Sequence, residues 1–470
     1  MSEDFDWQSE NDLNVLIERF EEFLKSGKGH FFDVEEFELI IDYYLENMQT
    51  SMSRTAFEWA REQHPGSHSF TIREARILAQ EHHYDQALQK LEQTEKIESG
   101  NEELYLAQAE IYSMIDQHEK AIEAYKKVLS TTDRPEEVLS NIAYEYESAN
   151  DFPNALLFLK KALELKPESE EMIQEISFFF ELTNRYEEGI EFFRDFLNEH
   201  PYSKFAWFNL GLFYSNIDLY EKAIQAYEFV LAIDENFSSA YFNMANAYTS
   251  MQQYKKAINL YKETLKLEKP EAITHFYIGE CYENLELYHQ ALSHYNQALD
   301  LDDKLADAWA GVARIFVEQH LENTAVKYYE KAIELAPNVD EFKYELAVIF
   351  LKQQDFTQSA PLFDAIIEHD PTQIDAWLNY SLIFALEGQL DEAVTLMERA
   401  VETNPESPSL WYRKAGYLYR SGKIEQAYFD IEKAVKLDFK RHSELTEYLP
   451  ELLDEPRFIE ILELYKETNK

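Results

Sequence analysis

The sequence predicts an all-α solenoid, and three observations carry this prediction. Glycine and proline, which interrupt helices, number only 11 and 13 in 470 residues. Apolar residues make up 45% of the chain, enough for a large core. The segments AIEAYKKVL, AIQAYEFVL, AINLYKETL and AVKYYEKAI are alike, and their first residues are Ala121, Ala223, Ala257 and Ala325. These residues are separated by multiples of 34, a period typical of stacked helical repeats.

Extending this period predicts twelve repeats over residues 34–441, with no insertion between them. The repeats begin at residues 34, 68, 102, 136, 170, 204, 238, 272, 306, 340, 374 and 408. Position 20 is always small: Ser53, Ala87, Ala121, Ala155, Gly189, Ala223, Ala257, Ala291, Ala325, Ser359, Ala393 and Ala427. Position 8 is small in every repeat except the first, where it is Ile41. Small side chains at both positions allow two helices to approach closely.

Large side chains recur between these small ones and predict two helices in each repeat. Position 11 is aromatic in ten repeats, and position 24 is always large and apolar. Tryptophan occupies position 4 in four repeats, and proline occupies position 32 in six, where it ends the second helix. Neither helix can bury its apolar side alone, so successive helix–turn–helix repeats must stack on one another.

The chain ends are predicted to cap the array, because a terminal repeat would otherwise expose an apolar face. In residues 1–33, Leu13, Leu16, Ile17, Phe20, Phe23 and Leu24 follow helical spacing and predict one amphipathic helix. In residues 442–470, the stretches SELTEYLPELL and RFIEILELY predict two more short helices near Pro450 and Pro456.

The repeat resembles the tetratricopeptide repeat family, whose period is 34 residues. The segment Trp207-Phe208-Asn209-Leu210-Gly211, followed by Tyr214, Ala223 and Tyr227, matches the family pattern, and the resemblance covers 408 of 470 residues. It implies a right-handed superhelix that binds other proteins without catalysis, similar to multi-repeat bacterial members. Three departures are local: Ile41 at position 8, Phe196 where a small residue is usual, and Thr274-His275 where an aromatic residue is expected at position 4.

Composition and motifs narrow the classes of function. The net charge of −47 argues against nucleic acid, whose phosphates would be repelled. No apolar run is long enough for a membrane span, and the acidic start MSEDFDWQSE does not resemble a signal peptide, so we expect a cytoplasmic protein.

A single cysteine, Cys281, excludes a disulfide framework, and we interpret it as a packing residue. His82-His83 is interpreted as part of a solvated turn. Without any HExxH, GxSxG, GxGxxG or phosphate-binding motif, we expect no enzyme activity, metal or cofactor.

The resemblance implies that ligands bind in a groove lined by the first helices, at positions 2, 5, 6, 9, 12 and 13 of each repeat. We call these the groove positions. Over twelve repeats they carry 18 acidic and six basic residues, which favours a basic partner. The family's clamp for carboxylate-ended peptides requires lysine, asparagine and arginine at set positions of three successive repeats. No three successive repeats supply that set, which disfavours such a role.

The repeats that begin at residues 204, 238 and 272 are predicted to hold the binding site. Only two of their 18 groove residues are charged, whereas five are aromatic and five are asparagine. Asparagine can hydrogen-bond the backbone of an extended peptide, and aromatic rings can contact its side chains. The predicted peptide-binding residues are Phe205, Phe208, Asn209, Phe242, Asn243, Asn246, Phe276 and Tyr277. Alternatively, these aromatic residues pack on their neighbours, and asparagine is simply common at position 6 of this repeat.

Three functions remain open from the sequence. The first is a non-enzymatic scaffold for protein–protein interaction, favoured because the repeats occupy nearly the whole chain. The second is an enzyme, or a sensor or regulatory protein, with a small ligand inside the superhelix, which would require convergent polar groups in a closed pocket. The third is a self-assembling structural protein that associates through apolar ends or the acidic outer face.

Overall fold

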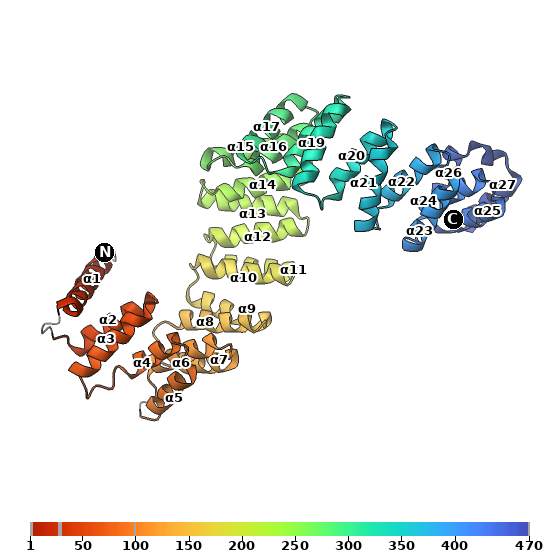
Figure 1. The fold of residues 1–470 in the computed structure, drawn as a ribbon. Helices are drawn as coiled ribbons and strands as arrows, with labels where there is room; N and C mark the ends of the chain where they lie inside the picture. Colours follow the sequence, from red (N-terminus) through yellow and green to blue (C-terminus); the bar gives the residue numbers. More distant parts are fainter. Residues whose placement is uncertain (1–2, 27–30, 98–99, 469–470) are drawn as a thin grey trace. The chain divides into compact units, whose positions relative to one another are not determined.

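The computed structural model describes residues 3–26, 31–97 and 100–468, and all regular structure in these residues is helical. The predicted all-α solenoid is therefore confirmed, and Figure 1 shows consecutive helices arranged as pairs. The chain divides into an N-terminal unit, residues 1–235, and a C-terminal unit, residues 236–470. Residues 27–30 of the predicted N-terminal cap lie outside the described residues.

In its described residues, the N-terminal unit contains one leading helix and six helix pairs. Its helices are α1 (Glu3–Ser26), α2 (Val34–Glu46), α3 (Thr50–Gln63), α4 (Thr71–Gln80), α5 (Tyr84–Glu95), α6 (Glu102–Met114), α7 (His118–Val128), α8 (Pro135–Ser148), α9 (Phe152–Leu165), α10 (Glu170–Leu182), α11 (Tyr186–Glu199), α12 (Lys204–Asn216) and α13 (Tyr220–Ile233). Helix α1 packs on α2 through a cluster that includes Leu16, Ile17, Phe20 and Phe23.

Over residues 236–468, the C-terminal unit contains six helix pairs and a helical end. Its helices are α14 (Ser238–Ser250), α15 (Tyr254–Leu267), α16 (Ala272–Asn284), α17 (Tyr288–Leu301), α18 (Ala306–Glu318), α19 (Glu322–Leu335), α20 (Asp340–Lys352), α21 (Phe356–His369), α22 (Ile374–Leu386), α23 (Leu390–Thr403), α24 (Pro408–Arg420), α25 (Ile424–Leu437), η1 (Phe439–Arg441), α26 (His442–Tyr448), η2 (Pro450–Asp454) and α27 (Pro456–Thr468). Leu445, Leu449, Leu452 and Phe458 from its end join the core formed by α21–α25. The division into twelve repeats with these starting residues stays a prediction.

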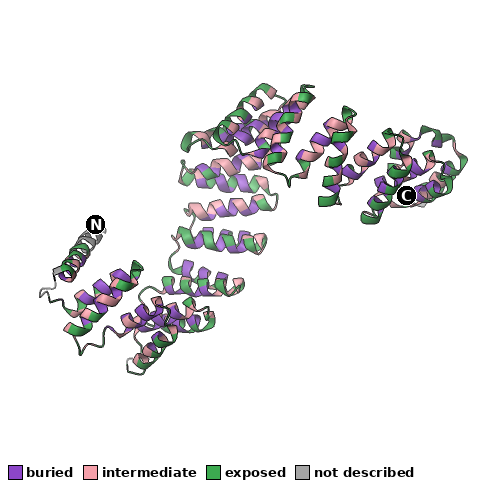
Figure 2. Cartoon of the chain, viewed as in Figure 1, coloured by how far each residue is buried: buried purple, intermediate pink, exposed green. Residues whose placement is uncertain are grey.

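The two columns of small residues lie where helices approach most closely. A Cβ atom built on Gly211 would be 2.4 Å from Cε1 of Tyr227, and one on Gly279 would be 2.6 Å from Cε1 of Tyr295. Every residue of the position-20 column is buried, as is every large residue at position 24. Figure 2 shows the buried residues along the sides of the helices that face their neighbours. The core is thus built from alternating small and large side chains in each helix pair.

The turn inside each helix pair has the same backbone form. Residues at 34-residue intervals have positive φ: Met48, His82, Asp116, Asn150, Asn184, Asp218, Gln252, Glu286, His320, Gln354, Gly388 and Gly422. In the turn after α16, for example, Glu286 has φ 59°, and the N–H of Leu287 donates to the carbonyl oxygen of Tyr282 over 2.9 Å. This left-handed residue closes the first helix and reverses the chain. Most of these residues are not glycine, although glycine adopts positive φ at the lowest cost.

The tryptophans at position 4 form hydrogen bonds with the loop between successive repeats. Each donates its indole N–H to the backbone carbonyl six residues earlier: Trp207 to Pro201 (2.9 Å), Trp309 to Asp303 (2.8 Å), Trp377 to Pro371 (2.9 Å) and Trp411 to Pro405 (2.8 Å). This hydrogen bond satisfies the polar end of a side chain whose rings pack between helices.

Candidate functional site

The predicted peptide-binding residues come from three first helices, α12, α14 and α16. In the N-terminal unit, Asn209 on α12 is only 5% exposed and donates its amide N–H to the carbonyl oxygen of Phe205 over 2.9 Å. The ring of Phe208 packs on that of Tyr227, with centroids 5.9 Å apart. One amide hydrogen of Asn209 is therefore used within its own helix.

In the C-terminal unit, the predicted residues meet in a packed aromatic group. Phe242 and Tyr277 have ring centroids 5.7 Å apart, and Tyr277 stacks on Tyr261 at 5.9 Å. The Tyr261 hydroxyl donates to the side-chain oxygen of Asn246 over 2.5 Å. Phe276 is 7% exposed. These contacts correspond to the alternative of aromatic residues that pack on their neighbours.

Asn243 and Tyr277 keep part of their surface open to solvent. Asn243 donates one amide hydrogen to the carbonyl oxygen of Ser239 over 2.8 Å, which leaves its side-chain oxygen and second hydrogen for other partners. Burial is the largest of the effects that raise the pKa of Tyr277, so its hydroxyl remains protonated at neutral pH.

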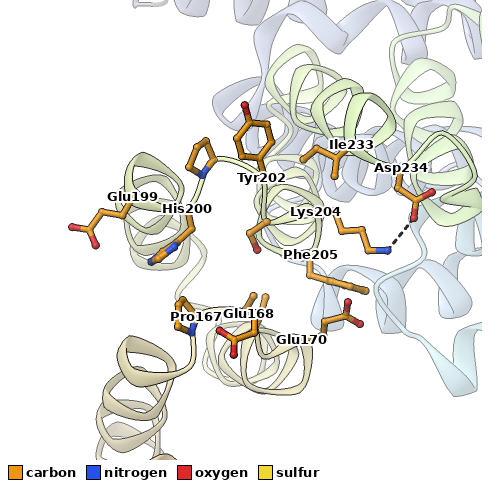
Figure 3. A pocket seen from close by; sticks show the side chains of 13 residues that line it. Pro167, Glu168, Glu170, Glu199, His200, Tyr202, Lys204, Phe205, Ile233 and Asp234 are labelled. Atoms are coloured by element: carbon orange, nitrogen blue, oxygen red, sulfur yellow. Dashed lines mark hydrogen bonds and ion pairs between the residues drawn. The ribbon is translucent and has the colours of Figure 1, made fainter. Parts of the chain in front are cut away.

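A hollow of about 670 Å³ lies in the N-terminal unit where α10, α12 and the loop before α12 meet, and Figure 3 shows it from close by. Phe205 is the predicted site residue that lines it, together with Tyr202 and His200 from the loop. The ammonium group of Lys204 pairs with Asp234 across 2.9 Å at its edge. The hollow is open and lies beside the loops that join repeats, so it is not the closed pocket that a small-ligand site requires.

Four apolar residues that were not selected from the sequence are more exposed than the predicted ones. Tyr144 and Phe178 occupy position 9 of successive repeats, on α8 and α10, and are 59% and 51% exposed. Met114 and Leu182 occupy position 13 and are 53% and 48% exposed. They were not selected from the sequence because acidic residues occupy other groove positions of the same repeats. A search for large apolar residues at positions 9 and 13 alone finds them.

The groove positions of the N-terminal unit also carry a charged cluster, which we call the Arg73 cluster. It consists of Arg73 and Arg76 from α4, Glu38 and Asp42 from α2, and Glu103 and Glu110 from α6. Arg73 is 9% exposed, and its guanidinium lies 2.6 Å from Asp42 and 3.5 Å from Glu103. Arg76 lies 3.2 Å from Glu110, whose pKa is nevertheless raised by burial. Each acid of this cluster has an arginine partner.

The groove positions of the C-terminal unit carry a second charged cluster, which we call the Arg314 cluster. It consists of Arg314 from α18, Glu280 and Glu283 from α16, and Glu341 and Glu345 from α20. Arg314 donates two hydrogen bonds to Glu283, of 2.8 and 3.2 Å, and Glu283 also accepts one from the Tyr295 hydroxyl. Burial, reinforced by neighbouring acids, raises the pKa of both Glu280 and Glu345.

His275, His294 and Cys281 are packed among other side chains of the repeats. At position 4 of its repeat, where tryptophan occurs elsewhere, His275 lies with its Nδ1 3.1 Å from Nδ1 of His294. Burial lowers the pKa of His294 to about 4. Cys281 is buried, and burial raises its pKa to about 11, the reverse of what a nucleophile requires. Within the described residues, no three histidine, cysteine or acidic side chains are placed to hold a metal ion.

Sequence comparisons decide the family. Models described as tetratricopeptide repeat match residues 102–132 and 136–169, and again residues 313–374, 344–408 and 387–437. A model of subunit 3 of the anaphase-promoting complex, or cyclosome, matches residues 216–298. The chain belongs to the tetratricopeptide repeat family. Members of this TPR family generally serve as non-enzymatic scaffolds for protein interaction, and this chain has their multi-repeat architecture.

Solved TPR structures are similar to the chain at low identity. The Cut9–Hcn1 hetero-tetramer structure of the APC/C has 12% identity and a TM-score of 0.42, over 88% of this chain and 94% of that one. A TPR protein from Parabacteroides merdae has 15% identity and a TM-score of 0.38, over 53% and 98%. YrrB, described as a TPR protein with an unusual peptide-binding site, has 18% identity and a TM-score of 0.32, over 39% and 95%. A comparison with curated protein sequences found no match. None of the described helices combines the length and apolar character that a bilayer crossing requires.

Proposed function

We propose that this TPR protein is a non-enzymatic scaffold that binds extended protein or peptide segments at its groove positions. One observation carries the proposal: large apolar side chains are exposed at groove positions of successive repeats, whereas the packing columns are buried. Tyr144 and Phe178 are more than half exposed, although the same helices bury every residue of their position-8 column. Solvent-exposed aromatic residues in series favour a binding surface over a purely structural face.

The eight residues predicted from the sequence remain part of this proposal. Asn243 has an amide oxygen and one hydrogen to offer to a peptide backbone, and Tyr277 presents part of its ring and a protonated hydroxyl. Phe242 packs on the ring of Tyr261, whose hydroxyl donates to Asn246, and the buried Phe276 packs on Tyr295. A bound segment would thus contact the partly exposed residues, while Phe276 and the two tyrosines hold them in place.

The partner and the compartment follow from charge and cysteine content. A chain of net charge −47 with acidic groove positions favours a partner with basic segments and disfavours nucleic acid. We assign the scaffold to the cytoplasm, because its single cysteine is buried and forms no disulfide, as is usual in a reducing compartment.

Site-specific photo-crosslinking tests the proposal. A photoreactive phenylalanine derivative replaces Phe178 at a groove position, and in a matched control it replaces Phe229, on the second helix α13, which is also 51% exposed. We expect a small set of proteins to crosslink at position 178 and not at position 229. Each is then purified, and the double variant Tyr144→Ser, Phe178→Ser should weaken its binding about tenfold, or ~1.4 kcal/mol.

Two results would count against a groove scaffold. Equal crosslinking at both positions would assign binding to no particular face. Crosslinks only between copies of this chain, with a concentration-dependent mass in light scattering, would replace the proposal by self-assembly.

A further inference from the structure

Buried tyrosines at position 24 direct their hydroxyl groups toward groove residues of their own repeat. The Tyr227 hydroxyl shares a hydrogen bond with Ser215 at 3.3 Å, and that of Tyr261 donates to Asn246 over 2.5 Å. The Tyr295 hydroxyl donates to Glu283. The partners occupy position 12 or position 9 of the repeat. A tyrosine in this column therefore reaches from the core to the floor of the groove.

Tyr329 occupies the same position but has no hydrogen-bond partner. Its side chain is 1% exposed, and its hydroxyl is buried and unpaired. Positions 9 and 12 of its repeat are Arg314 and Val317, and neither side chain can accept a hydrogen bond. Leaving a buried hydroxyl without a hydrogen bond is energetically unfavourable, so its presence calls for an explanation. One explanation is that the hydrogen-bond partner of this hydroxyl is supplied by a bound ligand.

The charges that act most strongly on the Tyr329 hydroxyl belong to the Arg314 cluster. Glu345 acts on it most strongly, followed by Arg314, Glu283 and Glu341. These charges occupy groove positions of three successive first helices, with acids on α16 and α20 and Arg314 on α18.

This cluster carries more negative charge than its own arginine can balance. Arg314 donates two hydrogen bonds to Glu283, to Oε1 over 2.8 Å and to Oε2 over 3.2 Å. Among the residues that the structure describes, neither Glu280 nor Glu345 forms an ion pair, and both are partly buried. Glu280 also faces Asp307 and Glu341, and Glu345 faces Glu341 and Lys352. Burial is the largest cause of the raised pKa of both carboxyls, and neighbouring acids add to it.

The missing partner is an organic cation with several hydrogen-bond donors. A metal ion does not fit, because within the described chain no three ligating side chains converge on one point. A guanidinium group has five donors and binds carboxylates in pairs, as Arg314 does with Glu283 in this cluster. An arginine on a flexible peptide would supply N–H donors for these carboxylates and for the Tyr329 oxygen.

We propose that Glu280, Glu345 and the Tyr329 hydroxyl form a subsite for an arginine side chain of a protein segment bound at the groove positions. The proposal rests on the scaffold function proposed above and deepens it by naming one recognised side chain. The excess charge attracts the guanidinium, and the tyrosine oxygen accepts one of its N–H groups.

Fluorescence anisotropy with the full-length protein tests the subsite. The probe is a fluorescein-labelled nonapeptide with two central arginines in a glycine–serine background, and its control carries glutamine in their place. We expect the arginine peptide to bind at least fivefold more tightly at low salt. The double variant Glu280→Gln, Glu345→Gln should weaken its binding about tenfold, and Tyr329→Phe about threefold.

A matched variant separates the subsite from general electrostatics. Glu330 lies beside Tyr329 on α19, is exposed, and belongs to no cluster. Glu330→Gln changes the charge by as much as each single substitution of the double variant and should leave the affinity unchanged. Circular dichroism must show equal helicity for all variants.

Several outcomes would overturn the subsite. These are equal binding of the arginine and glutamine peptides, no binding up to about 1 mM, or equal loss in the Glu330→Gln control. A lysine peptide that binds as tightly as the arginine peptide would overturn the assignment to guanidinium. The assignment to a protein segment would be overturned if the affinity of free spermine differed among the variants and the affinity of the peptides did not. If crosslinking at position 178 succeeds while these variants bind the partner normally, the scaffold function stands and the subsite falls.

Discussion

The Arg73 cluster and the Arg314 cluster both occupy groove positions, in different units, yet they differ in how completely their charges are paired. In the first, two arginines lie among four acids, and each acid has an arginine within 4 Å. In the second, one arginine serves four acids and binds only Glu283 closely. Paired buried charges hold neighbouring helices in register, whereas unpaired carboxylates leave capacity for a ligand. The comparison therefore separates a structural use of groove positions from a binding use.

The largest effect is expected from removing the buried arginine of the paired cluster. Arg73→Met leaves Asp42 and Glu38 facing each other without their cation, and should lower the unfolding free energy of this region by ~3 kcal/mol. Arg314→Met should cost less, about 1 kcal/mol, because Arg314 is more exposed and Glu283 keeps the Tyr295 hydrogen bond. Hydrogen exchange of amides in α2, α4 and α18 measures both effects. A greater loss from Arg314→Met would reverse the comparison.

The next effect concerns the close helix contact that positions Tyr295 against Glu283. Alanine usually stabilises a helix relative to glycine, but a Cβ on Gly279 would lie 2.6 Å from the Tyr295 ring. Gly279→Ala should therefore destabilise the C-terminal unit by ~2 kcal/mol. On α6, which contributes Glu103 and Glu110 to the Arg73 cluster, the corresponding residue is Ala109, and Ala109→Gly should show only the ordinary helix cost of ~1 kcal/mol. Urea denaturation followed by circular dichroism measures both, and a stabilising Gly279→Ala would contradict the packing argument.

A smaller effect is expected from pH and from neutralising the unpaired acids. Because the folded chain raises the pKa of Glu280 and Glu345, it binds their protons more tightly than the unfolded chain does. Stability from these groups is therefore present below the ordinary glutamate pKa and is lost as the pH rises through the raised values. Glu280→Gln with Glu345→Gln should raise the unfolding free energy at pH 7 by about 1 kcal/mol.

The paired cluster supplies the control for this prediction. Glu110 also has a pKa raised by burial, but it contacts Arg76 at 3.2 Å. Glu110→Gln removes that ion pair and should give no gain at pH 7. Thermal denaturation at pH 5 and pH 7 distinguishes the two results, and an equal gain in both clusters would remove the distinction between them.

The smallest effect is expected in the turns that follow the two clusters. Glu286, after α16, and Asp116, after α6, have φ values of 59° and 56°. Glycine adopts this conformation at lower cost, so Glu286→Gly and Asp116→Gly should each add about 0.5 kcal/mol. The gains should be equal, because the turn is local and independent of the cluster. Unequal gains in thermal denaturation would show that the turns are coupled to the groove charges.

The fold was predictable because a single period governs both helix packing and turn position. Small residues such as Ala223 and Gly279 have no other reason to recur, and they lie at the close contacts that the period predicts. The candidate site was less predictable, since groove residues are chosen by exposure, which the sequence pattern does not report. Phe276 was predicted to contact a ligand and is buried, whereas Tyr144 and Phe178 were passed over and are exposed.

The sequence by itself determined that this protein is an acidic array of paired helices, because side-chain size at fixed intervals dictates how neighbouring helices pack. Only the tertiary structure decided which polar groups are satisfied. Whether a tyrosine hydroxyl finds Ser215, Asn246 or Glu283, or finds nothing, as at Tyr329, depends on which residues of its own repeat come within hydrogen-bond distance. Hydrogen bonds act over about 3 Å, so their partners are fixed by the folded geometry and not by the pattern of residue types.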